Sequence, residues 1–249
     1  MITTVGIERE RFIIGVSSGK IVPAIGELLP RVQKMAQTKR ISPELFGYEL
    51  FAGQIEDRTP PCKSLADLRR SLRMNDEILN ELASQNGLGF SFTEFARESE
   101  IEALVVNPFN ERHKKIWDEI SPERRLAASR VAAVHVHIGC EATQALRLVN
   151  LCDRSVIDRL SRLGDHSNGR RIAAYRIMTQ SESVPPRFSD ISELLEYIRK
   201  HGSERNVWDL VRYRPSYGTT EFRMFGITPD IEEIIGFVNA CLDLFKSIR

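Results

Sequence analysis

One stretch near the C-terminus constrains the fold most strongly: Tyr-Gly-Thr-Thr-Glu-Phe-Arg-Met-Phe, residues 217–225. Its second half alternates, with Phe222 and Met224 on one face and Glu221, Arg223 and Phe225 on the other. A period of two is typical of a β-strand that buries one face in a core. The other face then presents a carboxylate and a guanidinium about 7 Å apart along the strand. A cross-strand ion pair on a solvated sheet face is the simplest interpretation of a single Glu-x-Arg motif.

Two further strand patterns carry acidic groups. Residues 3–14 predict a strand with Glu8 and Glu10 on one face, and residues 46–56 predict a second strand that includes Glu49 and Glu56. Gly53, inside the second pattern, predicts a bulge or a close approach of a ligand to the backbone. Carboxylates on one face repel each other unless cations lie between them, and hard divalent cations prefer oxygen ligands. Solvent exposure of these glutamates is the alternative.

A histidine pair lies on an otherwise apolar strand pattern. His135 and His137 project to one side of residues 133–139, where Val134, Val136 and Ile138 occupy the other side. Two imidazoles in register are typical of a functional site rather than of core packing. A zinc hydrolase of the amidohydrolase kind is one interpretation, but the remaining histidines lie in polar helix or loop segments: His113, His166 and His201.

Composition excludes several broad classes of function. The 249 residues contain 35 basic and 34 acidic side chains, a formal net charge of +1, so no nucleic-acid or membrane partner is expected. No apolar run approaches the length of a membrane span, and residues 1–4 have no signal-peptide layout. The four cysteines form no CxxC pair, which predicts free thiols and a cytoplasmic protein.

Helical periodicity fills the segments between the strand patterns. Ser64 and Asp67 predict a capping box at the start of a helix that ends near Gly87. A short strand is expected at 89–93 and a loop at 164–171. Interspersed helices and strands predict an α+β or mixed α/β fold in one domain, residues 1–249. The other helices are expected at 23–38, 111–132 with an interruption near 121–122, 141–163, 189–201 and 229–248.

Taken together and in order, these motifs resemble a known family. The matching segments are 5–10, 49–65, 134–139 and 218–223. The chain is similar to the carboxylate–amine ligases of the glutamate–cysteine ligase type 2 and amidoligase group, in the glutamine-synthetase-like superfamily. His-Val-His-Ile-Gly combined with Thr-Glu-Phe-Arg carries the resemblance, which spans nearly the whole chain.

The resemblance implies a fold and a reaction. The fold would be a curved, mainly antiparallel sheet funnel flanked by helices, as in the glutamine synthetase/guanido kinase-like proteins. The funnel would hold ATP and Mg²⁺ or Mn²⁺. A substrate carboxylate would take the γ-phosphate, and an amine would then displace phosphate to form an amide of the γ-glutamyl type. The partners would be a small-molecule acid and a small-molecule amine, with a homo-oligomer left open.

The resemblance also implies roles for individual residues. The metal ligands would be Glu8, Glu10, Glu49, Glu56, His135 and Glu221. His137 would lie near the phosphate or the acid substrate, Arg223 would neutralise the transferred phosphoryl group, and Arg170 or Arg171 would hold the nucleotide phosphates. No Walker-type loop is present, so metals and arginines would have to bind the phosphates.

Two departures from the family pattern stand out. Arg9 occupies a place that is often acidic in these ligases, and the chain is shorter than typical members between His135 and Glu221. The alternative from another class is a catalytically weakened relative that binds a nucleotide or an amino acid as a regulatory or scaffold module.

Overall fold

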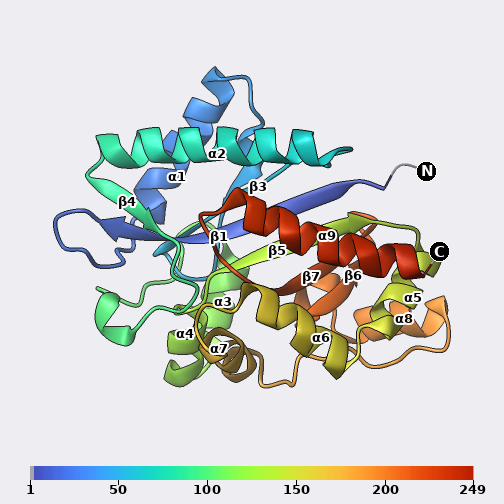
Figure 1. The fold of residues 1–249 in the computed structure, drawn as a ribbon. Coiled ribbons are helices and arrows are strands. Elements are labelled where there is room, and N and C mark those ends of the chain that lie inside the picture. The colour runs from blue at the N-terminus through green and yellow to red at the C-terminus, as the bar shows by residue number, and fades with distance from the viewer. Residues whose placement is uncertain (1–2, 249) are drawn as a thin grey trace.

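A computed structural model describes residues 3–248 as one antiparallel sheet flanked by helices (Figure 1). Within these residues, seven strands form the sheet in the order β2-β3-β1-β5-β7-β6, and β4 pairs with the far end of β1. The strands are β1 (Val5–Gly15), β2 (Phe46–Tyr48), β3 (Gln54–Arg58), β4 (Leu88–Ser91), β5 (Ala133–Gly139), β6 (Val211–Arg214) and β7 (Thr219–Gly226). The expected combination of helices with an antiparallel sheet is confirmed.

Helices pack around this sheet, and α9 lies in front of β5 and β7 in the view of Figure 1. In chain order they are α1 (Ile25–Thr38), α2 (Leu65–Gln85), α3 (Glu111–Glu119), α4 (Pro122–Ala128), α5 (Ala142–Leu151), α6 (Arg154–Ser161), α7 (Arg170–Thr179), α8 (Ile191–Lys200) and α9 (Ile231–Ser247). Among residues 3–248, no helix is long and apolar enough to cross a membrane.

Where α9 covers β5 and β7, the face of the sheet is apolar because the strands alternate. Val134, Val136 and Ile138 of β5 are fully buried in the main core, together with Phe222 of β7 and Val238 of α9. The predicted start of α2 is confirmed, because the Ser64 hydroxyl accepts a hydrogen bond from the Asp67 amide. The core therefore fixes which side chains of β1, β5 and β7 turn to the opposite face.

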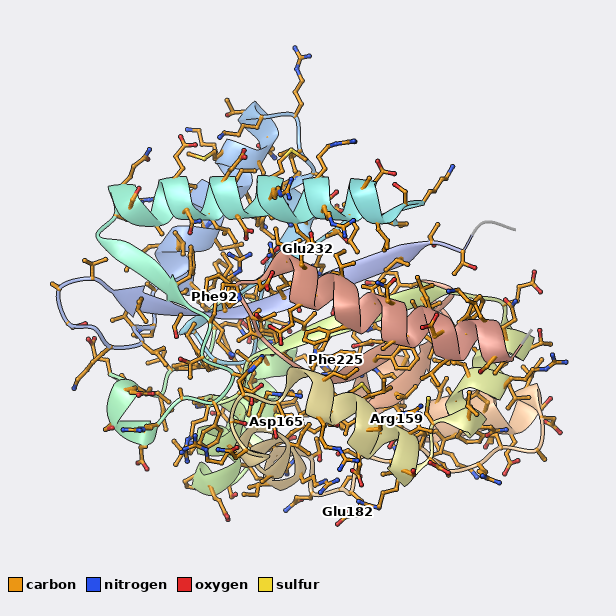
Figure 2. All side chains as sticks on the ribbon, in the orientation of Figure 1. Phe92, Arg159, Asp165, Glu182, Phe225 and Glu232 are labelled. Carbon is orange, nitrogen blue, oxygen red and sulfur yellow. The ribbon has the colours of Figure 1, made fainter. Side chains whose placement is uncertain are left out.

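A bulge in β7 changes the predicted faces of that strand. Val136 pairs with Phe222, but Val134 pairs with Phe225, so two residues of β7 oppose one residue of β5. Phe225, labelled in Figure 2, therefore shares the core face. Its ring stacks on Phe237 of α9, with ring centroids 4.5 Å apart. The prediction that Phe225 lies on the polar face with Glu221 was wrong, since strict alternation cannot anticipate a bulge.

Other segments differ from the sequence-based expectations. Residues 46–56 form two strands instead of one, and the turn between them contains Gly53. A Cβ at Gly53 would lie 2.4 Å from the Phe51 ring, so a core side chain, not a ligand, explains the glycine. The helix expected at 141–163 breaks at Asp153, whose carboxylate caps α6. Helix α7 and strand β6 were not predicted.

Candidate active site

The polar face of the sheet forms the floor of a cavity of about 420 Å³. This volume is within the usual range for small-molecule sites. Residues from α3 and from the segment before β6 wall the cavity, including Arg112, His113, Arg205 and Trp208. The floor and rim include six of the residues singled out by sequence: Glu8, Glu10, Glu49, Glu56, His135 and Arg223.

Strand pairing gathers an acidic and imidazole group at the centre of the floor. Glu8 of β1 pairs with His135 of β5, and Glu221 of β7 pairs with His137. One ligand atom each from Glu8, His135 and Glu221 lies within 4.8 Å of the others. His135 Nδ1 is 3.3 Å from Glu8 Oε2 and 3.6 Å from Glu221 Oε1. These three residues come from three adjacent strands, so the sheet itself sets their spacing.

The cavity is lined by several carboxylates close to one another: Glu8, Glu10, Glu49 and Glu56. Burial raises the pKa of Glu10 to about 8 even though Arg223 acts against this shift. Burial, with added repulsion from Glu10, raises the pKa of Glu49 to about 7. Burial also raises the pKa of Glu56 well above its usual range, although Arg58 opposes the change. These acids are held close together with too little positive charge to keep all of them ionised.

Three arginines line the same cavity and meet at Glu221. The Glu221 carboxylate accepts hydrogen bonds from Arg212 Nε at 2.8 Å, Arg214 Nη1 at 2.9 Å and Arg223 Nη1 at 2.5 Å. Burial alone would raise the pKa of Glu221, but Arg212 and Arg223 hold it well below the usual range. Arg214 also pairs with Glu204 Oε1 at 2.8 Å, so three guanidinium groups face two carboxylates and one positive charge remains in excess, which suits an anionic ligand.

Arg212 and Arg214 are site residues that the sequence interpretation missed. Both lie on β6, where Arg212 pairs with Glu221 across the ladder. The signal was present in the sequence, since Val211 and Tyr213 alternate with the two arginines and a Pro-x-x-Gly turn follows at 215–218. Such alternation before a turn predicts a hairpin with β7.

A second cavity of about 480 Å³ adjoins the first. Both cavities are lined by Glu8, Glu44, Arg58 and Tyr217, and His137 lines only the second of the two. Among the described residues, His137 Nε2 is a buried nitrogen with no hydrogen-bond partner, and it lies 3.5 Å from Glu8 Oε1. Its other ring nitrogen lies 3.1 Å from the Thr219 hydroxyl.

The two neighbouring arginines of α7 occupy different surroundings. Arg171 is buried, donates a hydrogen bond to the Met224 carbonyl and lines a small cavity with Glu10 and Arg223. Arg170 instead lies 5.5 Å above the Phe95 ring and donates to the Ser167 carbonyl. The fold therefore brings Arg171 toward the acidic group and directs Arg170 elsewhere.

The donor set matches a hard divalent cation. Carboxylate oxygens with one or two imidazoles are ligands that Mg²⁺ and Mn²⁺ accept. Burial and the nearby Arg223 lower the pKa of His135 to about 4, so the imidazole is neutral at neutral pH, as ligation requires. The raised pKa values of the acids and the unpartnered His137 nitrogen both fit a site that a cation would complete.

Comparison with known proteins places the motifs in context. A curated protein of Roseiflexus sp. (strain RS-1), named "Putative glutamate--cysteine ligase 2", is 26% identical over 250 residues, or 93% of this chain. A Rubrobacter xylanophilus protein of the same type is 28% identical over 239 residues. The chain resembles the type 2 glutamate–cysteine ligases. The resemblance inferred from the motifs is thereby confirmed. The chain spans 63% and 62% of the lengths of these two relatives.

A solved structure shares the fold. The crystal structure of a bifunctional glutathione synthetase from Pasteurella multocida aligns with a TM-score of 0.59 at 15% sequence identity. The alignment covers 98% of this chain and 38% of that one, which shows a common architecture. No family model matches the sequence.

Proposed function

We propose that the protein is an ATP-dependent carboxylate–amine ligase that forms an amide bond through an acyl phosphate. The observation that carries this proposal is one cavity where a carboxylate and imidazole group lies against three arginines, which meet at Glu221. The similarity to type 2 glutamate–cysteine ligases supports the same reaction class. Making an acyl phosphate brings two anions together, so a site for this reaction must gather positive charge around them.

The carboxylates of the cavity and its surroundings would hold Mg²⁺ or Mn²⁺. The proposed ligands are Glu8 and Glu10 of β1, Glu56 of β3, His135 of β5, Glu221 of β7, and Glu49, which directly follows β2. When bound, the metal would neutralise phosphate charge and act as a Lewis acid. Because it is an oxygen-rich set with few imidazoles, we favour magnesium or manganese over the zinc of a hydrolase.

The arginines of the site would bind the reacting anions. Arg223 is rigidly held, since its Nε donates to the Tyr175 hydroxyl at 3.3 Å while Nη1 bonds to Glu221. Its planar fork can meet phosphate oxygens in a bidentate way. We propose that Arg223 stabilises the transferred phosphoryl group and that Arg171, with Arg170 further out, contributes to nucleotide binding. His137 would contact the phosphate or the acid from the second cavity.

The curved-funnel architecture of the glutamine synthetase/guanido kinase-like proteins suits this reaction. Two adjoining cavities share Glu8 and Arg58. This arrangement supports separate approaches for nucleotide and for the small-molecule acid and amine. The long polar floor also leaves room for an in-line encounter between an acid and the γ-phosphate.

A substrate panel tests the proposal. The protein is incubated with ATP, Mg²⁺ and pairs drawn from amino acids, dicarboxylic acids and polyamines, and ADP release is measured. At least one pair should release ADP in proportion to amide formed. Glu8→Gln should abolish this release, while Glu81→Gln, an exposed glutamate of α2 that pairs with Lys39, should not. ATP binding without turnover for any pair would instead favour a nucleotide-binding module.

A further inference from the structure

Strand β1 carries a second charged face behind the cavity. Glu8 and Glu10 turn to the cavity, and the residues between and after them, Arg9 and Arg11, turn toward α2. Both arginines are completely buried. Fully buried arginines are rare unless they are paired. Their partners therefore decide what this face does.

Arg9 joins three elements through its guanidinium group. Its Nε and Nη2 donate to Asp57 Oδ2 of β3 at 3.1 and 2.8 Å, and Nη2 also donates to the Leu72 carbonyl of α2 at 3.1 Å. Asn75 of α2 donates to Asp57 Oδ2 at 3.0 Å and to the Arg58 carbonyl at 2.9 Å. The pair thus fixes β1, β3 and α2 relative to one another.

Arg11 completes the network and balances its charge. It lies 2.9 Å from Asp57 Oδ1 and 2.6 Å from Asp76 Oδ1, and its guanidinium stands 5.1 Å from the Phe92 ring centroid. Two arginines thus face two aspartates. A balanced network supplies little net field to the carboxylates on the other face of the sheet, so any effect on the cavity must come through geometry.

The strand register links this network to the acidic group. Arg9 pairs with Asp57, and the next pair along the ladder is Glu10 with Glu56, two carboxylates directly opposite each other. Like charges directly opposite destabilise a strand pair. A slip of one residue would exchange the two faces of β1. Apolar side chains would hold the helix layer on the sheet about as well as a buried ion pair does. What the charged network adds is that its hydrogen bonds fit only one register of β1 against β3.

We propose that Arg9 and Asp57, with Arg11, Asp76 and Asn75, are positioning residues. They hold β1 against β3 in the register that keeps Glu8 beside His135 and Glu221, and Glu10 opposite Glu56, despite the repulsion between the carboxylates. The inference rests on the proposed metal site, but it makes a separate statement about strand pairing in the metal-free protein.

The test removes the charged pair without creating an unpaired charge. The double variant Arg9→Met/Asp57→Leu is compared with wild type and with Arg69→Met/Glu232→Leu, which removes an exposed pair between α2 and α9. Mn²⁺ binding is measured by titration calorimetry, and amide hydrogen exchange is measured in β1 and β3 against β5 and β7. Asp57→Asn, which keeps the shape of the side chain, serves as a second variant if the double variant does not fold.

The proposal predicts weaker metal binding by about tenfold or more, the usual effect of losing a group that orients a ligand. It also predicts that exchange in β1 and β3 accelerates by about tenfold while β5 and β7 are unchanged. The exposed-pair control should match wild type in both measurements. A folded variant that keeps wild-type exchange in β1 and β3, or wild-type Mn²⁺ affinity, overturns the proposal. If wild type itself binds no Mn²⁺, the proposed metal site fails and the exchange result alone decides the positioning role.

Discussion

The two faces of β1 handle buried charge in opposite ways. On the α2 face, Arg9 and Arg11 meet Asp57 and Asp76, and the pKa of Asp57 is lowered because the two arginines outweigh the effect of its burial. On the cavity face, burial raises the pKa of Glu10 to about 8, and repulsion from Glu56 adds to the shift although Arg223 opposes it. On the α2 face each charge meets a charge of opposite sign, although among the described residues Arg11 Nε and Nη1 have no hydrogen-bond partner. On the cavity face Glu10 lies directly opposite another acid.

This difference separates structural charges from functional ones. A satisfied buried network stabilises a fold or fixes its geometry. A buried surplus of one sign costs stability and persists at sites that bind an opposite charge. A group of buried acids without balancing cations therefore identifies the site more reliably than the burial of a single charged residue does. Arg9 is just as buried as these acids, but it belongs to a balanced network.

The largest effect is expected from Glu221, which is fully buried beside the cavity and paired with three arginines. Glu221→Gln leaves Arg212, Arg214 and Arg223 without their shared carboxylate, so the free energy of unfolding should fall by about 3 kcal/mol. Glu10→Gln, the matched variant within the surplus, should leave stability unchanged or raise it because repulsion is relieved. Both variants should lose turnover. Urea denaturation of the two apo proteins checks the contrast, and equal stabilities would contradict it.

A smaller effect is expected when Arg223 keeps its charge but loses its shape. Arg223→Lys removes the bidentate fork, so kcat should fall by about a hundredfold while the Kd for ATP changes much less. Arg69→Lys is the control, because that guanidinium pairs with Glu232 at the surface and lies outside the proposed site. Steady-state kinetics with a nucleotide titration makes the measurement. An equal loss in kcat and in ATP affinity would make Arg223 a nucleotide-binding residue instead.

Nucleotide binding should depend on a divalent cation held by the carboxylates of the cavity. ATP at a hundred times its Kd should stabilise the protein by about 2.7 kcal/mol, but only when Mg²⁺ or Mn²⁺ is present. The reason is that surplus carboxylates repel phosphate unless a cation lies between them. Thermal unfolding with ATP plus Mg²⁺ and with ATP plus EDTA provides the comparison. An equal shift of the unfolding temperature in both samples would contradict a role for the metal in ATP binding.

The two faces should also respond oppositely to pH. The folded-state pKa of Glu10, about 8, lies above the ordinary value of 4.5, so the folded protein holds a proton that the unfolded chain has released. Stability should therefore fall as pH rises from about 4.5 to about 8, by at most about 1.4 kcal/mol per pH unit for each such acid. Glu10→Gln should flatten this decline.

The pH dependence of stability expected from the α2 face has the opposite sign. The pKa of Asp57 is lowered from its ordinary value of 3.8, so its contribution is present above that pH and is lost as the solution becomes more acidic. Denaturation curves across pH for wild type, Glu10→Gln and Asp57→Asn separate the two faces. A wild-type stability that rises between pH 5 and pH 8 would contradict the acidic surplus.

Much of this arrangement was readable from the sequence. The alternation of Glu8 with Glu10 and of His135 with His137 predicted which side chains share a face, because strand geometry fixes a period of two. The core residues Val134 and Val136 then fixed which face is polar. These patterns depend only on local geometry, and the structure places all four side chains at the two adjoining cavities.

What the sequence did not reveal depends on contacts between distant segments. The bulge that turns Phe225 into the core depends on packing against α9 and leaves no periodic signal. The pairing of Arg9 with Asp57 joins residues 48 positions apart, so a single sequence could not distinguish Arg9 from an exposed charge. Arg212 and Arg214 were missed although the hairpin pattern around them was present.

Isotope transfer tests the central claim most directly. An acid substrate labelled with ¹⁸O in its carboxylate is turned over with ATP, Mg²⁺ and the amine that gave ADP release. An acyl phosphate transfers one carboxylate oxygen to phosphate, so the account predicts labelled inorganic phosphate and ADP in equal amounts with the amide. Unlabelled phosphate, or AMP with pyrophosphate, would contradict it.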